Sequence, residues 1–106
     1  MKEIDNLTKE CIEVEEVKLA LQQNKKVLIV DVRSKEEFEQ AHIPNAINID
    51  LKELKDQLNR LNKDHQIITA CGKGGGRSTD GAKILKELGY NAVWLCGGTN
   101  KWLEIS

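Results

Sequence analysis

The chain has 106 residues, with 16 basic and 17 acidic side chains and a net charge of −1. This balance argues against nucleic acid as the main partner, because phosphate contacts need clustered Lys and Arg. No apolar run approaches the roughly 18 residues of a membrane-spanning helix, and the charged first residues lack the apolar core of a signal peptide. We therefore expect one cytoplasmic, monomeric domain over residues 1–106, with its core at about 10–104 and no membrane contact.

The cysteine pattern argues against a structural metal site. The three cysteines, Cys11, Cys71 and Cys96, are odd in number and widely spaced, and they form no Cys-x-x-Cys pair. His42 and His65 lie far from any metal-ligand spacing. No cluster of residues implies a metal or an organic cofactor.

Short strands and helices alternate along the first part of the chain. A strand is expected over residues 10–14, a helix over 15–23, and a strand at the apolar run 27–30. The continuity of that run is typical of a strand covered on both faces of a parallel sheet. The Ser-Lys-Glu-Glu segment 34–37 is a capping box that predicts a short helix ending at Gln40.

The alternation continues to the C-terminus and predicts an α/β fold with a mostly parallel sheet flanked by helices. After a turn at Pro44, the expected elements are a strand at 46–49, a leucine-striped helix at 51–61, a strand at 66–70, a helix capped by Ser78 and closed by Gly89, a strand at 92–96, and a final helix capped by Thr99. In such sheets ligands bind beyond the carboxyl ends of the strands. That rule points to Asp31, Cys71 and the Gly97–Gly98 turn.

The segment from Cys71 to Ser78 is the most informative part of the sequence. Four of the five residues between Cys71 and Arg77 are glycines, which permit positive φ and let backbone N–H groups converge on an anion. The start of the following helix adds positive potential, which favours a thiolate at Cys71. Arg77 adds a permanent positive charge for an oxyanion or a persulfide. The segment therefore predicts a site for nucleophilic attack on an anionic substrate.

Three groups of residues together resemble the rhodanese family. Segments 31–33, 36–38 and 42–49 resemble its N-terminal signature, and segment 71–78 resembles its active-site loop. Residues 95–98 with Trp102 resemble its closing motif. The match covers about residues 10–104 in the right order, and it implies a five-stranded fold.

The resemblance also implies roles for individual residues. Cys71 would take a sulfane sulfur from a small anionic donor such as thiosulfate and pass it, through a persulfide, to cyanide or a thiol, with a protein donor or acceptor as a further partner. Arg77 would close the loop or hold the substrate anion, and Asp31 and Arg33 would form a charge-paired scaffold. His42 belongs to a structural turn. The substrate loop would comprise Gly72, Lys73, Gly74, Gly75, Gly76 and Ser78.

One departure from the family pattern keeps other functions open. Many single-domain sulfurtransferases have four residues between Cys and Arg, whereas this chain has five. The longer loop resembles that of rhodanese-fold phosphatases and arsenate reductases, which typically carry His where this chain has Ala70. We favour sulfur transfer, with an arsenate reductase or phosphatase as the first alternative and a non-enzymatic sulfur relay as the second.

Cys96 ends the last expected strand, which should lie close to the strand that ends at Cys71. One hypothesis is that Cys96 resolves an oxidised or persulfidated Cys71 as a disulfide. The alternative is a buried strand cysteine. No role is assigned to Cys11.

Overall fold

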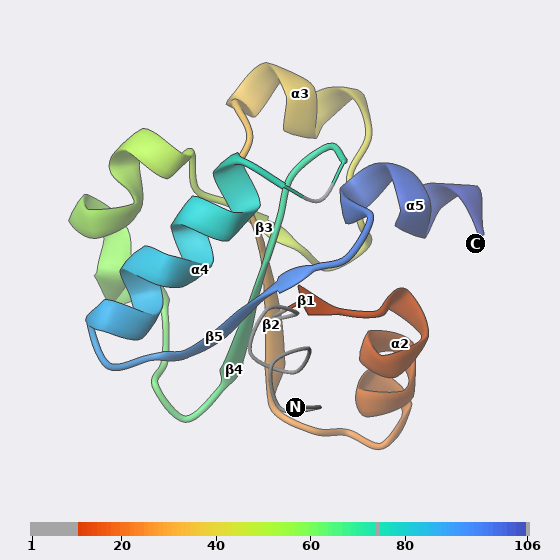
Figure 1. The fold of residues 1–106 in the computed structure, drawn as a ribbon, viewed down its shortest axis with the longest axis horizontal. Coiled ribbons are helices and arrows are strands. Elements are labelled where there is room, and N and C mark those ends of the chain that lie inside the picture. The colour runs from red at the N-terminus through yellow and green to blue at the C-terminus, as the bar shows by residue number, and fades with distance from the viewer. Residues whose placement is uncertain (1–10, 74, 106) are drawn as a thin grey trace, which may run out of the picture.

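The structure, a computed structural model, describes residues 11–73 and 75–105. A five-stranded sheet lies at its centre, and every neighbouring pair of strands is parallel (Figure 1). The strand order is β1-β5-β4-β2-β3, with β1 (Cys11–Ile12), β2 (Val27–Asp31), β3 (Ile47–Asn48), β4 (Gln66–Ala70) and β5 (Asn91–Leu95). The predicted α/β class and five-stranded fold are confirmed.

Helices cover both faces of the sheet. The helical elements are α2 (Val14–Gln22), α3 (Lys35–Gln40), the 3₁₀ helix η1 (Leu51–Arg60), α4 (Arg77–Glu87) and α5 (Gly98–Glu104). In Figure 1, α4 and η1 lie on one side of the sheet, and α2 and α5 lie on the other. Within the described residues, every helix is too short or too polar to span a bilayer.

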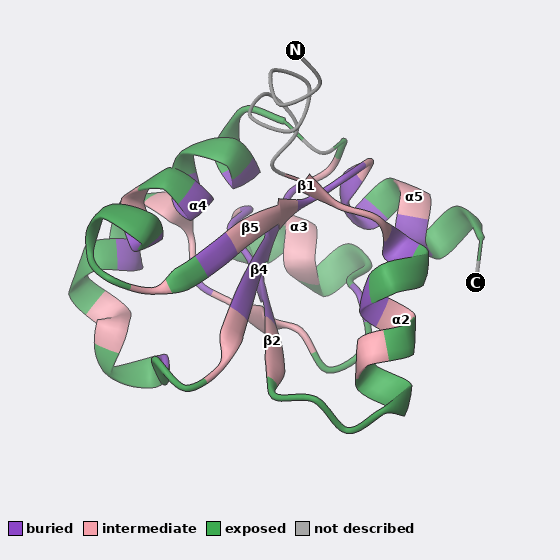
Figure 2. Cartoon of the chain, turned by 60° about the horizontal axis from the view of Figure 1, so that its bottom comes forward, coloured by how far each residue is buried: buried purple, intermediate pink, exposed green. Residues whose placement is uncertain are grey.

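The apolar strands fill two cores, one on each face. Ile29 and Ile68 are buried against α2 and α5, whereas Val30 and Ile67 are buried against η1 and α4. Consecutive residues of β2 and β4 thus serve opposite faces, as the continuous apolar run predicts. Figure 2 shows the buried residues along the central strands and on the inner sides of the helices.

Several local predictions are confirmed. Ser34 accepts a hydrogen bond from the Glu37 backbone N–H, and the Glu37 carboxylate accepts one from the Ser34 N–H at 3.0 Å, so the capping box opens α3. Strand β4 has its expected bounds, and Gly89 follows α4 at a φ of +92°. Gly81 lets α4 approach the sheet, since a Cβ there would lie 3.4 Å from a methyl carbon of Thr69.

The predicted leucine-striped helix is wrong in its type. Its residues form a 3₁₀ helix that begins after Asp50 and is broken at Gln57, where φ is −121° and ψ is 27°. Leu54 is fully buried, and Leu61 is buried just beyond the helix end. The apolar stripe therefore does its packing without a regular α-helix.

The two predicted side-chain caps, Ser78 and Thr99, are also wrong. Each helix begins two residues earlier than its predicted cap implies: α4 begins after Gly76, at φ 55° and ψ −103°, and α5 begins after Gly97, at φ 78°. Glycine supplies the unusual backbone angles that turn each chain segment into its helix. Ser78 and Thr99 therefore lie inside the first turns, where both are fully buried.

Candidate active site

Cys71 lies at the carboxyl edge of the sheet, directly after β4. Its side chain is buried, with 4% of the residue exposed. The Sγ atom lies 2.8 Å from the Gly75 carbonyl oxygen, to which it donates, and 3.2 Å from Ser78 Oγ. The loop therefore folds back over its own cysteine and places the sulfur at the start of α4.

A surface pocket of about 560 Å³ opens beside this sulfur. A larger hollow of about 720 Å³ lies between α3, β3 and η1, but its lining contains no cysteine. The pocket at Cys71 is the candidate site, because of the two linings only this one contains a cysteine thiol. Its lining is Arg33, Glu37, Cys71, Gly72, Lys73, Gly75, Gly76, Arg77 and Asn100. Of the expected loop residues, Ser78 is buried under the sulfur, and Gly74 lies outside the described residues.

Arg77 forms a two-pronged ion pair with Glu37 of α3. Its two terminal nitrogens lie 2.8 and 3.1 Å from the two carboxylate oxygens. The hydrogen bond from Arg77 is the main reason why the pKa of Glu37 falls to about 2, and the same bond raises the pKa of Arg77. The pair joins the start of α4 to α3 across the pocket rim. Arg77 thus has an acidic partner, and its predicted contact with a substrate anion stays a prediction.

Asp31 and Arg33 form the charge pair that the sequence predicts. Arg33 donates to both carboxylate oxygens of Asp31, with the shortest contact at 2.7 Å, and also to the Ala41 carbonyl oxygen at 2.7 Å. Both side chains are buried, with 9% and 1% exposed. Removing one partner of such a pair costs about 3–5 kcal/mol, because the other charge is left buried and unpaired. Through this pair Asp31 holds Arg33, which lines the pocket.

Helix α5 holds the other side of the loop. The Thr99 N–H donates to the Cys71 carbonyl oxygen at 2.8 Å, and the Asn100 N–H donates to the Gly72 carbonyl oxygen at 3.0 Å. Asn100 also lines the pocket. Sequence reasoning missed Asn100, for which no local pattern gives a signal. Glu37 was predicted as a capping residue and as part of the family signature, but its contact with Arg77 was missed, because the two residues lie 40 positions apart.

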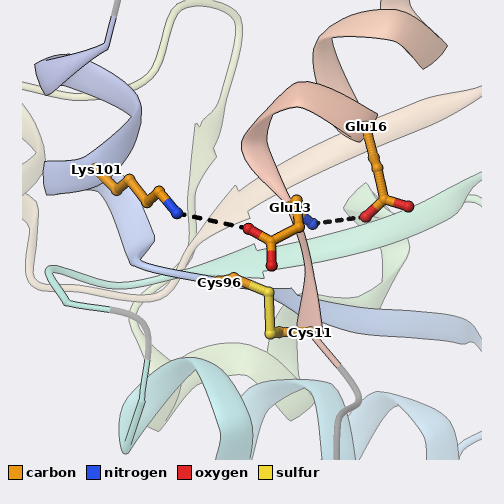
Figure 3. Close-up of a disulfide and its surroundings, with 5 residues drawn as sticks. All are labelled: Cys11, Glu13, Glu16, Cys96 and Lys101. Atoms are coloured by element: carbon orange, nitrogen blue, oxygen red, sulfur yellow. Dashed lines mark hydrogen bonds and ion pairs between the residues drawn. A yellow bond between two sulfur atoms is a disulfide. The ribbon is translucent and has the colours of Figure 1, made fainter. Parts of the chain in front are cut away.

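Cys96 has a different partner from the one proposed for it. Strands β4 and β5 are neighbours, as expected, but Cys96 forms a disulfide with Cys11, with 5.0 Å between their Cα atoms (Figure 3). Cys71 carries a thiol. The Cys71–Cys96 disulfide is therefore not formed in this structure, and Cys11, to which no role was assigned, joins β1 to the end of β5.

His42 stays with the structural turn after α3. Its Nδ1 atom lies 2.8 Å from the Phe38 carbonyl oxygen, and its ring stacks on the Phe38 ring with centroids 3.8 Å apart. His42 is exposed and does not line the pocket beside Cys71.

Comparisons with known proteins agree with this geometry. The family model described as "Rhodanese-like domain" matches residues 13–105. The putative sulfur carrier protein YrkF of Bacillus subtilis (strain 168) is 35% identical over 82 residues, which cover 77% of this chain and 44% of YrkF. The chain therefore spans less than half of that relative.

Two further matches cover most of the partner's length. The thiosulfate sulfurtransferase PspE of Escherichia coli (strain K12) is 39% identical over 70 residues, which cover 65% of this chain and 67% of PspE. The crystal structure of a rhodanese-like domain protein from Staphylococcus aureus is 37% identical and superposes with a TM-score of 0.80, covering 89% of this chain and 91% of that one.

Proposed function

Because the chain belongs to the rhodanese-like domain family, we propose that it is a sulfurtransferase that carries a persulfide on Cys71. It takes a sulfane sulfur from a small anionic donor such as thiosulfate and passes it to a thiol or to cyanide. One observation carries the proposal: the Cys71 sulfur lies at the start of α4, beside Ser78 Oγ, and borders the pocket. The printed names of PspE and YrkF, a thiosulfate sulfurtransferase and a putative sulfur carrier, support it.

The first half of the reaction loads the sulfur. The Cys71 thiolate attacks the sulfane sulfur of thiosulfate, the sulfur–sulfur bond of the donor breaks, and sulfite leaves with the electron pair. The positive end of α4 stabilises both the thiolate and the persulfide anion. The Ser78 hydroxyl, 3.2 Å from Sγ, turns to donate to the charged sulfur. Lys73 and Arg77 on the pocket lining supply positive charge that attracts the donor.

The second half unloads it. The acceptor attacks the outer sulfur of the persulfide, and Cys71 leaves as a thiolate. Cyanide becomes thiocyanate, and a thiolate becomes a new persulfide, so atoms and electrons balance without another reactant. The acceptor would approach through the pocket that Cys71 borders.

The intact mass of the protein tests this proposal. Protein with the Cys11–Cys96 disulfide kept oxidised is treated with thiosulfate, and its mass is measured before and after cyanide. We expect a gain of one sulfur atom that cyanide removes and that is absent in Cys71→Ser. A folded protein that gains no sulfur from thiosulfate would contradict the thiosulfate activity.

The same samples address the alternative that the loop length favours. Five residues between Cys71 and Arg77 leave room for a tetrahedral oxyanion, whereas Ala70 stands where the phosphatase and arsenate reductase relatives typically carry His. Arylphosphate hydrolysis that disappears in Cys71→Ser, without sulfur loading, would move the assignment to that class. Loading only from a protein persulfide would identify a sulfur relay.

A further inference from the structure

The three cysteines lie at the same edge of three adjacent strands. Strand β5 lies between β1 and β4, and Trp94 of β5 is in register with Cys11 on one side and with Thr69 on the other. Cys96 follows Trp94 by two residues, and Cys71 follows Thr69 by two residues. Cys96 and Cys71 are therefore level with each other, and Cys96 stands between Cys11 and Cys71.

The three side chains also share one face of the sheet. Side chains alternate along a strand, so Cys96 and Cys11 have the same orientation as Trp94, which packs against the core cluster that contains Cys71. Figure 3 shows the Cys11–Cys96 bond on the side of the sheet on which α4 lies. Level positions on neighbouring strands are about 4.8 Å apart, within the range of about 4.4–6.8 Å that disulfide-forming cysteines need. Sulfur exchange between Cys71 and Cys96 thus requires little movement of the backbone.

The oxidation states of the three cysteines differ. Cys11 and Cys96 are joined as a disulfide, whereas Cys71 carries a thiol. In a reducing compartment a disulfide is usually transient, and it forms in catalysis or in redox sensing. A pair of thiols that gave two electrons to a group on Cys71 would leave this combination of a disulfide and a thiol.

We propose that Cys11 and Cys96 form a dithiol that reduces the persulfide on Cys71 and releases its outer sulfur as sulfide. The proposal rests on the sulfur loading of Cys71 proposed above. It adds an activity to the chain, a persulfide reductase whose electron donor is built into the sheet. The structure then represents the spent, oxidised form.

The steps balance within the chain. The Cys96 thiolate attacks the outer sulfur of the Cys71 persulfide, the sulfur–sulfur bond breaks, and Cys71 leaves as a thiolate while Cys96 becomes a persulfide. The Cys11 thiolate then attacks the inner sulfur of Cys96 and expels hydrosulfide, forming the observed disulfide. Two thiols are oxidised by two electrons, and the sulfane sulfur is reduced to sulfide. An external thiol must then reduce the disulfide before the next turnover.

The burial of the three cysteines is consistent with the roles proposed for Cys71, Cys96 and Cys11. Cys96 is 8% exposed and is absent from the pocket lining, so its sulfur is placed to exchange within the chain, whereas Cys71 also borders the pocket through which solutes reach it. Cys11 is only partly buried, at the strand edge where an external reductant can reach the disulfide. The N–H groups of Thr99 and Asn100 hold the backbone of Cys71 and Gly72, so the turn after Cys96 keeps the two sulfurs in a fixed relation.

A single-turnover experiment tests the proposal. Fully reduced protein, freed of reductant, receives one equivalent of thiosulfate, and sulfide is quantified while peptide mapping follows each cysteine. We expect one sulfide per chain, a Cys11–Cys96 disulfide and a Cys71 thiol. The oxidised wild-type protein is the matched control, with an identical sequence: it loads sulfur on Cys71 and releases no sulfide.

Two variants separate the steps. Cys96→Ser retains the sulfur on Cys71 and releases no sulfide. Cys11→Ser cannot form the observed disulfide, so any sulfide that it releases must come with a Cys71–Cys96 disulfide, which peptide mapping detects. The proposal is overturned if the reduced wild-type protein keeps its persulfide while Cys11 and Cys96 stay thiols, or if Cys96→Ser releases as much sulfide as the wild type. If oxidised wild type and Cys96→Ser both fail to load sulfur, the proposed sulfurtransferase function fails, and this inference fails with it. A purely structural disulfide would change the unfolding temperature but not sulfide release.

Discussion

Strands β4 and β5 end in the same way and serve different purposes. Each is followed by a cysteine, a glycine turn and a helix. After Cys71 the turn has five residues before α4, and it borders a pocket. After Cys96 the turn is Gly97 alone, and the sulfur is bonded to Cys11. The comparison teaches that the loop after the cysteine, rather than the cysteine's place at a strand end, creates the site for a substrate.

Both helices that follow these turns are also tied by an ion pair near their first turns. Arg77 binds Glu37 of α3 through two contacts, the shorter at 2.8 Å, whereas Lys101 lies 3.5 Å from Glu13, at the start of α2 (Figure 3). The two strand ends are joined as well, because the Thr99 N–H donates to the Cys71 carbonyl oxygen. The helix that follows the short turn at Gly97 therefore also holds the backbone at the start of the long loop after Cys71.

The largest expected effect separates the two cysteines. Cys71→Ser removes the nucleophile, so we expect no sulfur to be loaded from thiosulfate, whereas Cys96→Ser should load fully. Intact mass after a brief thiosulfate pulse measures both. Loss of loading in the folded Cys96→Ser variant would show that the two strand ends share the first chemical step, contrary to the comparison.

The next effect separates the two glycine turns. Gly97→Ala places a side chain on a residue with a φ of +78°, and its Cβ would lie 2.7 Å from the Lys101 Cβ. We expect a loss of about 2–4 kcal/mol in unfolding free energy from strain and overlap together. Gly76→Ala has open space around it, so only backbone strain at φ +55° and ψ −103° opposes it, and a smaller loss of about 1–3 kcal/mol is expected, with slower loading.

Urea denaturation of the two variants and the wild type measures this difference. Unfolding slopes that agree among the three proteins show that the comparison of stabilities is valid. A larger destabilisation in Gly76→Ala would mean that the long loop, not the short turn, is the more constrained of the two strand ends.

Much of the fold and part of the site could be predicted from the sequence, because the patterns that indicate them lie within a few consecutive residues. The apolar run of β2 shows in a few consecutive residues, and the capping box at Ser34 needs only its neighbour three positions on. The charge pair of Asp31 and Arg33 joins residues two positions apart. The glycine loop after Cys71 likewise marks the pocket by composition alone.

The contacts that couple distant segments were not predictable. Cys11 and Cys96 are 85 residues apart, and their proximity follows from a strand order that places β1 beside β5. Local rules also failed where glycine geometry prevailed: Ser78 has the chemistry of a cap, but Gly76 turns the chain first and leaves the hydroxyl beside the Cys71 sulfur. The partner of Cys96 was thus set by long-range strand pairing, and the start of α4 was set by the backbone angles of Gly76.

A smaller effect is expected when the ion pair between Glu37 and Arg77 is removed. In Glu37→Gln the amide can still serve the capping box, but the charge that binds Arg77 is lost. Because the two side chains are 45% and 42% exposed, solvent screens the pair, and we expect a loss below about 1 kcal/mol in unfolding free energy. Sulfur loading should slow several-fold, since the start of α4 loses its anchor. Glu39→Gln, on the same helix and with the same change of charge, is the control and should leave loading unchanged.

The smallest effect is the pH dependence of the stability that the Glu37–Arg77 ion pair contributes. The pKa of Glu37 lies at about 2, below its ordinary value of 4.5, chiefly because Arg77 donates a hydrogen bond to it. A lowered pKa means that folding favours the charged carboxylate, so its contribution is fully present above pH 4.5 and is lost as the pH falls toward 2. The difference in unfolding free energy between wild type and Glu37→Gln should stay constant from neutral pH down to about 5, and then shrink on further acidification. Because the other carboxylates titrate alike in both proteins, the difference isolates Glu37. If it grew on acidification instead, folding would favour the protonated carboxyl, and Arg77 would not be the partner that anchors the long loop.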